Sequence, residues 1–78
     1  MRPEKIREHL RAAPFQPLRI FLSDGSFHDV PHPDFAFVSV HKLEIVKDVN
    51  SAGVPYHTVT CDPVHVTRIE PQPQAATG

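Results

Sequence analysis

The sequence predicts a mostly β, α+β domain in which an amino-terminal helix caps a strongly bent antiparallel sheet of about five short strands. Three observations predict it. A charged amphipathic stretch opens the chain, short β-branched and aromatic runs fill its middle, and turn residues separate these runs closely. Short strands with open edges are expected to curl on themselves, so the predicted architecture is a small barrel.

The size of the chain limits it to one domain. It has 78 residues, of which 40% are apolar and 22% charged, as in an ordinary globular domain. A chain near this size buries only about 60% of its unfolded surface, so its margin of stability is small. We expect a single domain over residues 1–71. Residues 72–78, "QPQAATG", have nothing to bury and are expected to form a disordered tail.

The first ten residues, "MRPEKIREHL", are charged and lack the apolar core of a secretory signal. No apolar run reaches the 18 or so residues that a membrane-spanning helix needs. The single cysteine, Cys61, excludes an internal disulfide. These features favour a soluble cytoplasmic protein without a membrane partner.

The overall charge gives no attraction to nucleic acid or to anionic lipid. The net charge is −1 with histidine neutral, and protonation of all six histidines would change it to +5. Free histidine titrates near pH ~6.5. A partner held by negative charge would therefore bind better in mild acid.

A helix is predicted over residues 3–13. Pro3 suits the first helical turn, where its missing N–H is not needed, and Pro14 ends the helix. The apolar positions form one narrow stripe: Ile6, Leu10 and Ala13.

The charged side chains of this helix are spaced to pair across one turn. Glu4 precedes Arg7 by three residues, and Glu8 precedes Arg11 by three. We expect a salt-bridged, solvent-facing surface here rather than a basic helix for nucleic acid.

The clearest strand is "LRIFL", residues 18–22, followed by an Asp24-Gly25 turn that favours a hairpin. The return strand ends at Pro31, which has no N–H to donate. Further runs typical of strands cover residues 35–40, 43–49, 55–61 and 64–69. The run over residues 35–40, "FAFVSV", is expected to be buried on both sides or sharply twisted.

At "LRIFLSDGSFHDVPHPDF" and "VHVTRIEP" the chain resembles a group of short uncharacterised bacterial proteins. They share a proline-phenylalanine connector after a helix, an Asp-Gly turn, a His-Pro-acidic motif and a final Arg-Ile strand. The resemblance implies no activity. The element order is also similar to that of Sm-like small barrels. RNA-binding members of that class carry Arg-Gly near the last strand, whereas here Ile69 follows Arg68.

The stretch "HDVPHPD", residues 28–34, is the main candidate for chemistry. A metal needs three or four donors within roughly 2.0–2.2 Å of one point. The two prolines exclude a helix, and in an extended chain His28 and His32 lie roughly 13 Å apart. His32 and Asp34, two apart on a strand face, are the only feasible local pair. A third donor would come from elsewhere, with these candidates: His41, His57, Cys61 and His65.

Without a metal, "HPDF" is interpreted as a rigid corner. Pro33 favours an extended conformation at His32, and the Asp34 side chain is expected to cap the amides of a tight turn. The polar side chains of the corner then face a partner.

Catalysis is not expected, and neither is a cofactor. Cys61 lies four residues from His57 on a predicted strand, too far for a nucleophile and its base. The chain also has no glycine-rich phosphate loop and no serine in a nucleophile-elbow context.

The leading hypothesis is a non-enzymatic protein-interaction domain that forms a homo-oligomer or binds another protein. Phe21 shares a strand face with Arg19 rather than with the apolar residues, so both faces of the sheet need cover. The predicted partner contacts are Arg19, Phe21, His28, His32, Asp34 and Arg68.

Two alternatives remain open from the sequence. One is a nucleic-acid-binding Sm-like small barrel that uses exposed aromatic residues with these cations: Arg19, Lys42, Lys47 and Arg68. The other is a metal-binding protein that uses His32 and Asp34.

Overall fold

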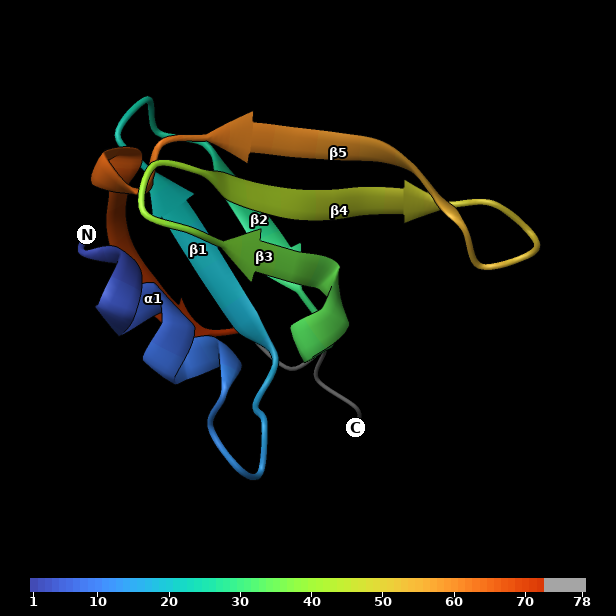
Figure 1. Cartoon of the computed structure of the whole chain (residues 1–78), viewed down its shortest axis with the longest axis horizontal. Coiled ribbons are helices and arrows are strands. Elements are labelled where there is room, and N and C mark those ends of the chain that lie inside the picture. Colours follow the sequence, from blue (N-terminus) through green and yellow to red (C-terminus); the bar gives the residue numbers. More distant parts are fainter. Residues whose placement is uncertain (73–78) are drawn as a thin grey trace, which may run out of the picture.

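The computed structural model describes residues 1–72 as one helix and six strands in two three-stranded antiparallel sheets (Figure 1). The elements are α1 (Pro3–Leu10), β1 (Leu18–Leu22), β2 (Phe27–Val30), β3 (Ala36–Val38), β4 (Leu43–Val49), β5 (Pro55–Cys61) and β6 (Val66–Pro71). One sheet has the order β2-β1-β6 and the other β3-β4-β5. The mostly β, α+β prediction is confirmed.

The single bent sheet of about five strands is corrected to two sheets with six strands, and the strands described form no closed barrel. The division falls at the corner after β2. Pro31 and Pro33 interrupt the ladder there, and a 3-10 turn, η1 (Pro33–Phe35), precedes β3. The chain therefore leaves the first sheet and starts the second.

The two sheets share one core. Alternate residues of β1 point inward, because side chains of a strand alternate between its two faces. The buried residues come from both sheets and from the helix: Ile6, Leu18, Ile20, Leu22, Val30, Leu43, Ile45 and Val66. Ile6 is the helix's buried contact, so α1 is held by one main apolar side chain.

The helix is shorter than predicted and ends at Leu10 instead of residue 13. Arg11 has φ −103° and ψ 4°, outside the helical region. Ala13 is exposed, so extending the helix would add no apolar contact. Pro14 also disfavours a helical conformation at Ala13.

The third apolar run also differs from the prediction. A strand covers only Ala36–Val38, and Phe37 is 64% exposed and Val40 70% exposed. The exposure of Phe37 shows that the outward face of β3 is open. The expectation of burial on both sides is therefore wrong.

Two hairpins organise the chain. The Asp24-Gly25 turn joins β1 to β2 as predicted, with Gly25 at φ 89°, a conformation that glycine adopts without steric cost. The β4–β5 hairpin is longer, and its tip extends away from the rest of the molecule (Figure 1).

The carboxyl end of the described chain lies beside the connector before β1. The Gln72 N–H donates to the Pro17 carbonyl at 2.8 Å. The remainder of the predicted tail, residues 73–78, is outside the described residues. Within residues 1–72 no helix is long and apolar enough to cross a membrane.

Candidate interaction surfaces

The outer face of the first sheet carries three of the predicted contact residues. We call it the arginine–phenylalanine face: Arg19, Phe21, Phe27, Asp29, Arg68 and Glu70. The ladder places Phe21 opposite both Phe27 on β2 and Arg68 on β6. Arg19 likewise lies opposite Asp29 and Glu70. The prediction that Phe21 shares a strand face with Arg19 is therefore confirmed, and the register adds Arg68 to the same face.

Each phenylalanine ring on this face is covered by an arginine. The Arg68 guanidinium carbon lies 3.7 Å from the Phe21 ring centroid, and that of Arg19 lies 4.1 Å from Phe27. The two ring centroids are 5.8 Å apart. Each guanidinium covers part of its ring, although Phe27 remains 47% exposed. The cover that the sequence required for Phe21 thus comes from the same chain.

Carboxylates neutralise both of these guanidinium groups. Arg19 donates from Nε and Nη2 to Asp29 at 2.8 and 3.2 Å, and this hydrogen bond is the main reason why the pKa of Arg19 is raised. Arg68 Nε donates to Glu70 at 2.6 Å. Two cations and two anions leave the face without net charge, which makes it a poor site for phosphate.

His28 faces the other way and joins the two sheets. It lies opposite Ile20 in the ladder, and its Nδ1 is 3.0 Å from the Lys47 ammonium on β4. Burial, and secondarily the charge of Lys47, lowers the pKa of His28. Neutral imidazole accepts this hydrogen bond, so His28 links β2 to β4.

The corner residues do not form the predicted pair. His32 and Asp34 are both exposed, and the 3-10 turn at residues 33–35 removes them from a common strand face. The His32 ring packs near Phe35, with centroids 5.7 Å apart. Within residues 1–72 no group of three or more histidine, cysteine or acidic side chains is arranged to hold a metal. Nor does the Asp34 carboxylate cap the turn, since η1 has no side-chain cap.

Two contacts bear on catalysis. Ser23 Oγ lies 3.3 Å from His65 Nδ1, a pair that the sequence did not predict because 42 residues separate them. Both side chains are exposed, and within residues 1–72 no carboxylate bonds to the His65 ring. Burial raises the pKa of Cys61, with the charges of Asp62 and Asp24 adding to the effect. Its thiol therefore stays protonated at neutral pH, which makes it a weak nucleophile.

Strand β5 is the longest of the outer strands among residues 1–72. It is the outer strand of its sheet, and Tyr56 at its start is 70% exposed. Next to it in the hairpin, Val49 is 39% and Val54 56% exposed. The strand "PYHTVTC" contains no aspartate, glutamate, lysine or arginine. The lack of these charged residues can be read from the sequence, but only the sheet order shows that the strand lies at an edge.

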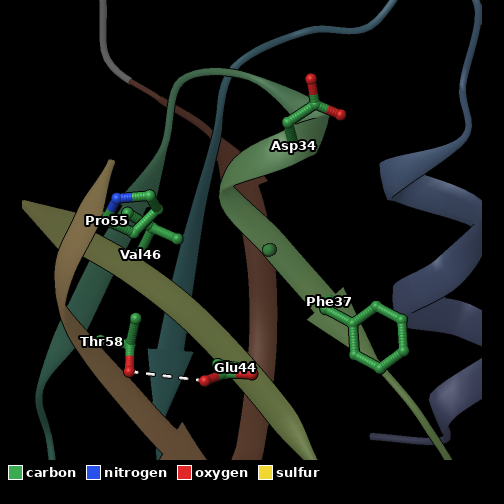
Figure 2. Close-up of a pocket in the computed structure, with 7 residues that line it drawn as sticks. Asp34, Phe37, Glu44, Val46, Pro55 and Thr58 are labelled. Atoms are coloured by element: carbon green, nitrogen blue, oxygen red, sulfur yellow. Dashed lines mark hydrogen bonds between the residues drawn. The ribbon is translucent and has the colours of Figure 1, made fainter. Parts of the chain in front are cut away.

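The opposite edge of the same sheet adjoins the helix. A groove of about 610 Å³ lies between α1 and β3, with Arg7 and Arg11 on one side and Phe37 on the other. A smaller hollow of about 230 Å³ on the outer face of this sheet shares Phe37 with the groove (Figure 2). Sequence reasoning missed Arg7, Arg11 and Phe37, because only the tertiary fold brings α1 beside β3.

Comparison of the chain with protein families, with curated proteins and with solved structures finds no match in any of the three. The interpretation of these surfaces therefore depends on their own geometry.

Proposed function

We propose that this protein is a non-enzymatic interaction module that self-associates through β5, the edges of two copies pairing about a two-fold axis. The observation that carries the proposal is a seven-residue outer strand, free of charged carboxylate, ammonium and guanidinium groups, on a projecting hairpin. An exposed edge strand presents unpaired backbone N–H and C=O groups, which are a template for another strand.

A comparison of the outer strands favours β5 over the others. Strand β2 has four residues and is joined to β4 by the His28–Lys47 contact. Strand β3 has only three residues. Strand β6 carries Arg68 and Glu70 and ends in a proline, all features that discourage edge pairing. Strand β5 begins with Pro55, but it is the longest of these outer strands and has no aspartate, glutamate, lysine or arginine.

Symmetric pairing suits the composition of β5. When the strand pairs antiparallel with its own copy, the centre of the pairing falls at Thr58, and Tyr56 comes to lie opposite Thr60. His57 comes to lie opposite Val59 in this register, so no two like charges oppose one another across the interface. His57 is itself paired with Asp48 at 3.1 Å within its own chain. The product is a six-stranded sheet that spans two copies, with the two-fold symmetry usual among homodimers.

The absence of an enzymatic role is part of the proposal. Its support is the raised pKa of the Cys61 thiol and the exposure of the Ser23–His65 pair. A serine nucleophile needs a base that a third group orients, and a positioned set of oxyanion donors as well.

The Sm-like architecture is likewise a proposal for the arrangement of the sheets. Its support is that the first strand pairs with the last and that the His28–Lys47 contact joins the sheets along a second side. RNA binding by such a barrel is the weaker alternative. Three of the cations that it would use already contact acidic groups in this chain, at 4 Å or less: Arg19, Lys42 and Arg68.

The test is the solution mass at high micromolar concentration. We expect a dimer for the unaltered protein and a monomer for Thr58→Lys, because two ammonium groups would meet at the centre of the interface. Ser51→Lys, in the loop of the same hairpin, makes the same charge change off the strand and should leave the dimer intact. Sedimentation velocity measures the masses, and far-ultraviolet circular dichroism checks the fold of each variant.

A monomer at every concentration rejects self-association. A dimer that Thr58→Lys leaves unchanged places the interface elsewhere and rejects the β5 edge. A mass above that of a dimer indicates head-to-tail pairing of unlike edges and rejects the two-fold arrangement.

A further inference from the structure

The groove between α1 and β3 combines three features that strand pairing at β5 does not use. It has a volume of about 610 Å³ and lies at the opposite edge of the same sheet. Six of its lining residues matter here: Arg7, Leu10, Arg11, Asp34, Phe37 and Val38.

The helix side of the groove carries two cations that form no ion pair with any of residues 1–72. Arg7 lies in the last turn of the helix and Arg11 is the residue that caps its end, and both line the groove. The pairs expected with Glu4 and Glu8 are not formed. Among residues 1–72 the ion pair on this helix joins Lys5 to Glu8 at 3.6 Å. Both arginines are exposed, so their guanidinium groups are available to an anion.

The strand side supplies apolar surface. Phe37 is 64% exposed, and its ring lies on the side of β3 that faces the helix (Figure 2). Leu10 and Val38 are half-buried against the core and contribute to the lining. Since Phe37 also borders the hollow on the outer face of the sheet, the ring is open to contact from both spaces. A large exposed aromatic ring of this kind is typical of an interaction site.

The third feature is the backbone of β3. This strand pairs only with β4 among residues 1–72, so its other edge has no strand partner. An extended peptide beside it can make main-chain hydrogen bonds, as in the addition of a strand to a sheet edge.

We propose that this groove binds a short extended segment of a partner protein in which acidic side chains alternate with apolar ones. Alternate side chains of an extended segment point to opposite sides, so acidic groups reach Arg7 and Arg11 while apolar groups contact Phe37. The helix has eight residues and is about 12 Å long, which matches about four extended residues.

Charge favours a peptide over a nucleic acid as the occupant. The chain has a net charge of −1, and Asp34 lies in the groove itself. Glu4 and Glu8 lie on the same helix as the two arginines. A polyphosphate would meet these carboxylates along its length, whereas a segment with two or three acidic side chains avoids them.

The test uses the full chain and the peptide acetyl-Glu-Val-Glu-Val-Glu-amide, followed by amide chemical shifts in NMR. We expect saturable shifts at residues of α1 and β3. Loss of both guanidinium groups in Arg7→Ala/Arg11→Ala should weaken binding about tenfold or more, as should Phe37→Ser. Arg2→Ala/Lys5→Ala removes the same charge from this part of the chain outside the groove and should leave the affinity within about twofold.

Three outcomes overturn the proposal. They are the absence of saturable shifts at millimolar peptide, equal binding of the lysine analogue acetyl-Lys-Val-Lys-Val-Lys-amide, and tighter binding of a single-stranded decathymidylate in the groove. The result is separable from that for β5. Thr58→Lys should alter the mass without altering peptide affinity, and Phe37→Ser should do the reverse.

Discussion

At the scale of single residues, the arginines of the first sheet act as its outer layer. Phe21 and Phe27 lie on a face that the sequence leaves half apolar, and the guanidinium groups of Arg68 and Arg19 cover their rings. A planar guanidinium can stack on an aromatic ring while its N–H groups bond to a carboxylate. The pattern of residues correctly predicted that Phe21 shares a face with Arg19. It did not show that the cover is internal, because cation–π geometry depends on the register of three strands.

His28 is the residue from which we expect a pH dependence. Its pKa is lowered in the folded protein, so the unfolded chain binds the proton more readily. The contribution of His28 to stability is complete above its ordinary value of about 6.5 and declines as the pH falls below it. The free energy of unfolding, measured by urea denaturation, should therefore decrease as the pH is lowered from 7 towards 5.

A glutamine at position 28 checks this assignment. Its side-chain oxygen can still accept from Lys47 but does not titrate, so His28→Gln should flatten the pH dependence. His41→Gln, on an exposed turn, is the matched control. A slope that persists unchanged in His28→Gln would contradict the role given to this residue.

At the scale of elements, the helix depends on one buried side chain. Ile6 is fully buried, and it is the only residue of α1 that is. We expect Ile6→Ala to lower the free energy of unfolding by about 2–4 kcal/mol, because it leaves a cavity where α1 meets both sheets. Glu4→Ala, on the exposed side of the helix, should change it by less than about 0.5 kcal/mol.

Chemical denaturation measures both variants. A loss below about 1 kcal/mol for Ile6→Ala would mean that the helix contributes little to the folded state, and that the groove it forms with β3 is not fixed. Since a domain of this size has a small margin of stability, the expected loss is a large part of the total.

The elements themselves were predictable to different degrees. Strand β1 and the turn after it follow from alternating apolar residues and from Asp24-Gly25, both of which act locally. The end of α1 and the exposure of Phe37 were missed, because they depend on what lies across from each residue. The corner at residues 33–35 was predicted as a turn. Its 3-10 conformation, however, takes His32 and Asp34 off the common strand face on which they were expected to lie.

At the scale of the whole molecule, the division into two sheets determines which surfaces remain open. The chain enters the second sheet after the prolines of the corner, so four outer strands result instead of the two of a single open sheet. The sequence pattern did not predict this division, because it shows where strands lie along the chain and not how they associate. The candidate surfaces at β5 and at the α1–β3 groove both result from it.

Self-association at β5 should make the stability depend on protein concentration. A dimer of folded chains draws the equilibrium away from the unfolded monomer, so the midpoint of thermal unfolding should rise with concentration. We expect this rise for the unaltered protein and its absence for Thr58→Lys. Differential scanning calorimetry over a hundredfold range of concentration measures it, and a constant midpoint would contradict the dimer.

The exposed tyrosine of the long hairpin has an optical consequence. Tyr56 is the chain's only tyrosine, there is no tryptophan, and the ring lies 70% exposed at the start of β5. Emission excited near the tyrosine band therefore comes from one position, beside the edge at which a second copy is proposed to bind. The unaltered protein thus carries its own fluorescent reporter. Tyrosine emission measured during dilution would follow the separation of two copies without an attached dye.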